Sequence, residues 1–138
     1  MNRIQNSIKG WWAAMLLVVT MVMPQNATAQ TKKIGTIDEL KAFIEAVNNN
    51  VKTNEQFNAQ LTADIDATEL GNDVVIGTKE NPYQGTFDGK NYTITVNINM
   101  SENDNIGLFG YIRNATIENL VVSGTITGKS NVGALVGY

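Results

Sequence analysis

A fixed offset between short apolar segments constrains this chain more than any other feature. Two segments recur 26 residues later: Ile94 and Val96 match Leu120 and Val122, and Ile106-Gly107 matches Val132-Gly133. A repeat of this length, built from short strands and Gly/Asn/Asp turns, is typical of a solenoid, because one coil cannot bury its apolar face until a neighbour stacks on it. Residues 57–138 are therefore predicted to form about three coils of a β-solenoid.

The alternation of apolar and polar residues supports strands in this region. Tyr92, Ile94, Val96, Ile98 and Met100 occupy alternate positions, which predicts one buried face. The same alternation begins near residue 58 and continues through 61–66. The first coil, 64–77, follows the offset poorly, so it is expected to be either a degenerate coil or a capping strand pair.

Residues 36–48 carry a helix pattern. Thr36 and Glu39 have the spacing of a capping box, in which both side chains bind free amides at the helix start. An apolar stripe follows, and it consists of Leu40, Phe43, Ile44 and Val47. This pattern predicts an amphipathic helix that packs on the solenoid and covers its N-terminal open end, so that its first edge is protected.

Several residues are expected to have structural roles in the repeat. They are Gly107, Gly110, Gly133 and Gly137, together with Asn119. The glycines permit corners with positive φ and close approach of neighbouring backbones. Asn119 stands where the inward phase of the strand shifts, which predicts a bend or bulge and a corner residue that bonds to backbone.

The first 29 residues have the pattern of a secretory signal peptide. A short basic region precedes an apolar run at 11–23, and small residues end at Ala29, the predicted cleavage site. The chain contains no cysteine for lipid attachment, so a secreted or cell-surface location without a lipid anchor is expected. The predicted organisation is a signal peptide at 1–29, a lead segment and capping helix at 30–56, and the solenoid at 57–138.

Composition excludes several kinds of chemistry and partner. The chain has no histidine and no cysteine, which removes Cys/His zinc sites, Ser-His-Asp triads and cysteine nucleophiles. Removal of Arg3 and Lys9 with the signal peptide turns the net charge of −3 into −5. An acidic domain without basic clusters is a poor partner for nucleic acid or anionic membranes. We therefore expect a protein that is not an enzyme and has no cofactor.

The Gly-Leu-Phe-Gly segment at 107–110 and the Gly-Ala-Leu-Val-Gly segment at 133–137 resemble the GLUG repeat of secreted and surface-exposed bacterial proteins. The segments at 62–66, 76–78 and 82–94 resemble the lead-in that precedes such repeats. This resemblance implies a right-handed parallel β-helix outside the cytoplasm, often within adhesin-like proteins. Some members belong to large metallopeptidases, but this chain has no His-Glu-x-x-His helix, so no peptidase activity is carried over.

The sequence stops at Tyr138, the counterpart of Tyr111, in the middle of a repeat. The last strand, at about 131–138, is expected to leave unpaired backbone groups on an apolar edge. The sequence is therefore interpreted as a truncated N-terminal fragment of a longer protein. Further repeats at this edge, or a docked partner strand, are the expected partners.

Four residues are weak candidates for ligand contacts. Asp64 and Asp66 share a strand face and offer carboxylates to calcium, although two exposed acids on a strand need no ligand to explain them. Tyr83 and Tyr111 could present rings to a sugar. The favoured function is a structural or adhesion module that contacts a host or bacterial surface glycan or protein. The alternatives are a carbohydrate-binding module and an accessory region of a larger polysaccharide-active or peptidase protein.

Overall fold

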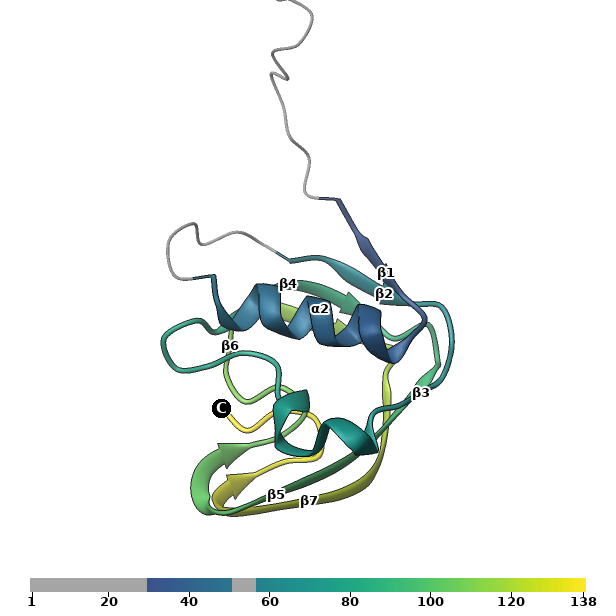
Figure 1. The fold of residues 1–138 in the computed structure, drawn as a ribbon. Helices are drawn as coiled ribbons and strands as arrows, with labels where there is room; N and C mark the ends of the chain where they lie inside the picture. The colour runs from purple at the N-terminus through teal and green to yellow at the C-terminus, as the bar shows by residue number, and fades with distance from the viewer. Residues whose placement is uncertain (1–29, 51–56) are drawn as a thin grey trace, which may run out of the picture.

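The computed structural model of the chain describes residues 30–50 and 57–138. The predicted signal peptide and its cleavage site Ala29 lie outside these residues. The described chain is mainly β, with one α-helix and one 3₁₀ segment (Figure 1). In chain order the elements are β1 (Lys32–Ile34), α2 (Ile37–Asn48), β2 (Ala59–Leu61), β3 (Ile65–Asp66), η1 (Thr68–Val74), β4 (Tyr83–Asp88), β5 (Thr93–Ile106), β6 (Ile112–Glu118) and β7 (Val121–Val132).

The strands form two parallel sheets. The first has the order β1-β2-β4-β6 and the second the order β3-β5-β7, and neighbouring strands in each sheet are parallel. A third line of contact consists of single parallel bridges that join Ile76 to Phe109 and Phe109 to Val136. Three successive segments, 57–82, 83–111 and 112–138, each contribute to both sheets and to this third line. Long-range parallel pairing of neighbouring segments therefore dominates the fold.

The predicted matching of strands is wrong by two residues at the start of β5. Ile94 lies opposite Val122 and not Leu120, and Val96 lies opposite Gly124. Side chains on a strand alternate with a period of two, so a slip of two residues leaves the same residues facing the core. The apolar pattern could not distinguish these two registers.

The predicted offset of 26 holds at the other end of the same strand pair. The register shifts between Met100 and Asp104, and beyond the shift Ile106 lies opposite Val132, as predicted. Long strands β5 and β7 run side by side through this irregularity (Figure 1). The offset of 26 residues therefore holds only for the part of the β5–β7 pair that follows the register shift.

The predicted helix is confirmed together with its cap. Helix α2 begins after Thr36, whose Oγ1 accepts a hydrogen bond from the Glu39 amide at 3.2 Å. The Glu39 carboxylate accepts from the Gly35 amide at 2.8 Å, and this bond lowers the pKa of Glu39. The helix ends at Asn48, and its predicted apolar stripe is buried, namely Leu40, Phe43, Ile44 and Val47.

Helix α2 covers the core beside the first sheet (Figure 1). The ring of Phe43 lies 5.8 Å from that of Phe87, 6.0 Å from Tyr83 and 6.4 Å from Phe57. These contacts join the helix to strand β4 of the second segment. Strand β1 is the edge strand of the first sheet, and α2 contacts it; whether the helix protects this edge stays a prediction.

Asparagines, more than glycines, occupy the corners of the chain. Among the described residues, positive φ values occur at four glycines, at one lysine and at five asparagines; the non-glycine residues are Lys90, Asn91, Asn105, Asn114, Asn119 and Asn131. Asn119 separates β6 from β7 with φ of 51°, which confirms the predicted bend. Its side chain donates to the Asp88 carboxylate and not to backbone. Asparagine tolerates the left-handed region better than most residues.

The four predicted repeat glycines act through close packing. Gly107, Gly110, Gly133 and Gly137 are absent from the positive-φ residues, so the prediction of positive-φ corners is wrong for them. The second part of the prediction is confirmed, since a Cβ on Gly137 would lie 2.3 Å from the backbone carbon of Asn105. Neighbouring segments approach each other too closely here for any side chain.

The first segment is less regular than the other two. Its second-sheet strand β3 has two residues, and the 3₁₀ segment η1 follows it. The Asn72 side chain donates to the Asn99 carbonyl at 3.0 Å and accepts from the Asn99 amide at 2.8 Å. One side-chain amide therefore takes the place of a strand residue beside β5, which agrees with the expected degenerate coil.

Burial of apolar residues differs along the stack of segments. In the second segment Phe87, Ile94 and Phe109 are fully buried, whereas Tyr92 is 36% exposed and does not share the predicted inward face. The inward residues of the third segment are only half buried, and they include Ile117, Leu120, Val122, Ile126, Leu135 and Val136. Strands β6 and β7 are the edge strands on this side of both sheets.

Candidate functional site

A cleft of about 560 Å³ lies where the C-terminal half of α2, the loop at 77–80, the end of β5 and Tyr111 meet. Pockets of roughly 300–1,000 Å³ are typical of small-molecule sites. Apolar surface from Ile44, Val75, Met100 and Ile106 lines part of the cleft. Its rim carries charged and amide side chains, so the cleft combines apolar contact with polar groups.

Asn48 fixes two walls of the cleft against each other. Its Nδ2 donates to the Val75 carbonyl at 2.9 Å, and its Oδ1 accepts from the Gly77 amide at 2.7 Å. The Asn48 carbonyl accepts from Asn81 Nδ2 at 2.7 Å. The helix end is thereby tied to the loop that follows η1. The helix pattern at 36–48 indicates Asn48 only as its last residue and does not predict this role.

Tyr111 lies in the cleft, whereas its predicted companion Tyr83 does not. The Tyr111 hydroxyl accepts a hydrogen bond from Asn105 Nδ2 at 2.8 Å, and its ring lies 5.8 Å from that of Tyr138. The tyrosine is half buried and lines the cleft. Its aromatic ring is therefore held in place beside open space.

The proposal of Tyr83 as a ligand contact is corrected by its burial. Tyr83 has no exposed surface, and its hydroxyl donates to the Phe57 carbonyl at 2.6 Å. Burial raises the pKa of its hydroxyl. Its ring lies 5.2 Å from that of Phe109, inside the core. Tyr83 is therefore a core residue that satisfies its polar group internally.

Asp64 and Asp66 each bind a neighbouring backbone amide. Asp64 accepts from the Thr93 amide at 2.8 Å, which links the first and second segments. Asp66 accepts from the Thr68 hydroxyl at 2.7 Å and from the Thr68 amide at 3.1 Å, and these bonds lower the pKa of Asp66. Within residues 30–50 and 57–138, no group of three or more acidic side chains could hold a metal ion.

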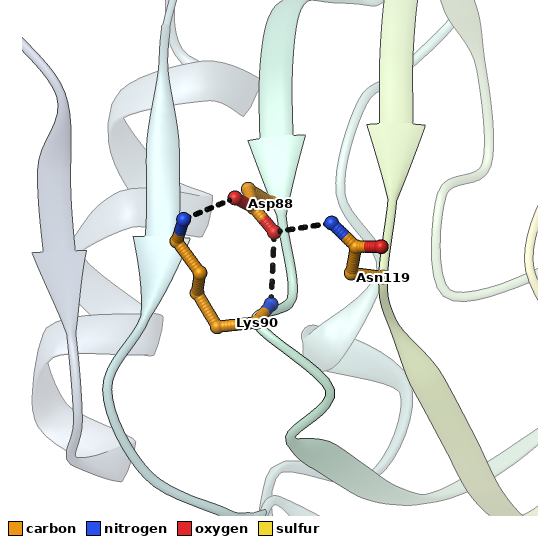
Figure 2. A network of polar contacts seen from close by, with 3 residues as sticks. All are labelled: Asp88, Lys90 and Asn119. Atoms are coloured by element: carbon orange, nitrogen blue, oxygen red, sulfur yellow. Dashed lines mark hydrogen bonds and ion pairs between the residues drawn. The ribbon is translucent and has the colours of Figure 1, made fainter.

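A polar network joins the corners of the second and third segments (Figure 2). The Lys90 ammonium lies 2.8 Å from Asp88 Oδ2, and Asn119 Nδ2 donates to Asp88 Oδ1 at 3.1 Å. The Lys90 amide donates to the same oxygen at 2.9 Å. The contacts from Lys90 and Asn119 lower the pKa of Asp88 to about 2, and the carboxylate raises the pKa of Lys90. This exposed network ties the corner of the second segment to that of the third.

Two more polar contacts link the second and third segments. Asn131 Nδ2 donates to Asn105 Oδ1 at 2.7 Å, and the Ser130 hydroxyl donates to Asp104 Oδ1 at 2.5 Å. Each pair spans 26 residues, the predicted offset. Asn105 also donates to the Tyr111 hydroxyl, so it connects the third segment to Tyr111.

The comparisons with known proteins give no relative. No protein-family model, curated protein or solved structure matches the chain. None of the helices within the described part of the chain has the length and apolar character needed to span a bilayer.

Proposed function

We propose that the chain is a secreted or cell-surface structural and adhesion module, without catalytic activity, built as a right-handed parallel β-helix. One observation carries the proposal: three successive segments lie in parallel register in both sheets. Stacked coils of this kind form an extended, stable surface in which each coil buries its neighbour. The handedness follows from the strong preference for right-handed connections between parallel strands.

The resemblance to GLUG repeats supports an extracellular role. The two segments that carry the resemblance, 107–110 and 133–137, include Phe109 and Val136, which pair directly in parallel. Equivalent parts of the sequence motif thus occupy equivalent places in the stack. We propose that the chain belongs to a bacterial adhesin-like surface protein with GLUG repeats.

The exposed side of β6 and β7 is the surface that we propose for partners. Its inward residues are half buried, and Val121 and Val132 are 49% and 44% exposed. Parallel edge strands present backbone groups that can pair with another strand. A further repeat or a partner strand of similar pattern would bury these residues as the third segment buries those of the second.

Engineered cysteines test the stack, since the chain contains none of its own. Thr95 lies opposite Ser123, so Thr95→Cys with Ser123→Cys should form a disulfide under mild oxidation. Neighbouring strands are about 4.8 Å apart, within the range that a disulfide spans. Thr95→Cys with Val121→Cys is the control, because two residues of displacement add about 6.6 Å along the strand. Equal cross-linking of both pairs would contradict the register.

Export tests the proposed location. The full chain should leave the bacterial cytoplasm, and mass spectrometry should find a product that begins at Gln30. A full-length cytoplasmic product would overturn the extracellular half of the proposal. A polysaccharide panel assayed for new reducing ends should show no turnover, whereas any turnover would overturn the non-catalytic half.

The cleft beside Tyr111 favours carbohydrate recognition as a second candidate function. It places a held aromatic ring next to polar groups and open space. This candidate is compatible with adhesion, because a surface module needs a contact site for its target.

A further inference from the structure

We propose that the cleft between α2, the loop at 77–80 and Tyr111 binds a neutral oligosaccharide. This inference rests on the cleft alone and is independent of the strand register that the cysteine pairs test. The cleft has a volume of about 560 Å³, combines apolar and polar lining, and contains the one sequence-predicted sugar contact, Tyr111, that keeps exposed surface.

Charged groups of both signs line the cleft. The positive groups are Lys41 and Lys79, and the negative groups are Glu45, Asp73, Glu80 and Asp104. In the described parts of the chain, the ion pair between Lys90 and Asp88 is the only one found, so none of the cleft charges forms an ion pair there. The excess of carboxylates disfavours an anionic ligand, and the two lysines disfavour a strongly cationic peptide.

A neutral polyhydroxylated ligand satisfies both kinds of group. A hydroxyl donates to a carboxylate and accepts from an ammonium, so one sugar ring can bind Glu80 and Lys79 with different hydroxyls. Asn103 also lines the cleft. A side-chain amide carries both donors and an acceptor, so it has the same capacity. No net charge on the ligand is needed.

The apolar lining suits the carbon face of a sugar ring. Tyr111 supplies a rigid aromatic side chain, and Val75 and Met100 add aliphatic surface to the same cleft. Small-molecule sites commonly combine apolar and aromatic contact with a few placed polar groups. The Asn105 bond holds the Tyr111 hydroxyl, so less side-chain freedom is lost when a ligand binds.

The cleft is formed before any ligand arrives. Asn48 ties the helix to Val75 and Gly77, and Asn81 ties the loop back to Asn48. These bonds hold two walls at fixed separation. Preorganised walls improve affinity by reducing the ordering needed on binding.

The experiment applies the full chain, exported by a bacterial host, to an array of neutral, acidic and amine-bearing oligosaccharides. A polylysine peptide is a further probe. We expect binding to neutral oligosaccharides, with the affinity of the best one measured by calorimetry. Absence of binding to every neutral oligosaccharide, or stronger binding to acidic glycans or to polylysine, would overturn the proposal.

Substitutions then place the binding in the cleft. Tyr111→Ala should weaken the measured affinity about tenfold or more. Tyr92→Ala is the matched control, because Tyr92 is 36% exposed and does not line the cleft, and it should leave the affinity unchanged. Equal losses from both substitutions would show that the cleft is not the site.

A second variant protects the test against misfolding. Tyr111 also contacts Asn105 and Tyr138, so its loss could disturb the fold. Lys79→Ala combined with Glu80→Gln changes two exposed side chains at the rim and should keep the melting temperature. It should still reduce affinity about tenfold, and unchanged affinity in this variant would refute the assignment.

Discussion

The two ends of the stacked segments are built differently. At the α2 end, a capped helix covers the core. The side-chain amides of Asn48 and Asn72 bond there to backbone groups that would otherwise need a strand partner. At the β6–β7 end, backbone pairing is regular, but the inward apolar side chains are half buried among the residues described. The comparison teaches that regular pairing and complete burial are separate requirements, because a stacked sheet buries an apolar face only when something lies over it.

The largest expected effect comes from removing the ring that joins the helix to the strands. Phe43→Ala should reduce the free energy of unfolding by about 3–5 kcal/mol, because a buried aromatic side chain is replaced by a cavity. Lys41→Ala on the exposed face is the control. Urea unfolding measures both. A loss below about 1 kcal/mol for Phe43→Ala would mean that the helix contributes little to the covered end.

A register-matched pair compares burial between segments. Ile94 is fully buried, and its partner Val122 is half buried. Ile94→Ala should cost about 2–5 kcal/mol, and Val122→Ala should cost about 1 kcal/mol or less because part of its surface already contacts water. Urea unfolding of both variants measures the difference. Equal costs would show that the β6–β7 side is covered in solution, for example by self-association that size-exclusion chromatography would detect.

Asn48 tests how much a side-chain amide contributes at the covered end. Asn48→Ala should cost about 1–3 kcal/mol, because it leaves the Val75 carbonyl and the Gly77 amide without this partner in a part-buried site. The neighbouring exposed Asn49→Ala provides a matched control. Thermal unfolding of the two variants measures the difference in stability. Indistinguishable unfolding midpoints would mean that backbone packing, and not the Asn48 side chain, holds the helix end against residues 75–77.

The smallest effect concerns the exposed network at Asp88, between the second and third segments. Its pKa is lowered from 3.8 to about 2, so its stabilising contribution is complete above pH 4 and is lost as pH falls toward 2. Asp88→Asn should therefore reduce the fall in melting temperature that occurs as the pH is lowered from about 4 to about 2. Lys129→Gln, the control, should leave this pH dependence unchanged. If Asp88→Asn keeps the wild-type pH dependence, another carboxylate is responsible for it.

Local patterns predicted several elements correctly because their causes are local. Thr36 and Glu39 identify the helix start, since a capping box involves only neighbouring residues. The inward faces of Ile94 and Ile98 follow from alternation alone. Strand register needed more, because a two-residue slip keeps every side chain on its face, and the apolar pattern places Ile94 equally well opposite Leu120 or Val122.

The candidate site was predicted only in part. Tyr83 and Tyr111 both stand at or just before the start of a strand of the first sheet, yet one is buried against Phe109 and the other lines a cleft. Part of the packing around Tyr83 comes from helix α2, whose Phe43 ring lies 6.0 Å from the Tyr83 ring. Asn48 lies far from Val75 and Gly77 in the sequence, so no local pattern could assign its bonds.

The sequence by itself determined the helix and the inward faces of Ile94, Val96 and Ile98, because periodicity and capping depend on residues close together in the chain. Its composition alone determined the absence of thiol and imidazole chemistry. Tertiary structure decided which residues lie opposite each other, which tyrosine is accessible and where the cleft forms. Those features arise from contacts between segments about 26–33 residues apart, and packing and hydrogen bonding between them select one arrangement among several that the sequence pattern allows equally.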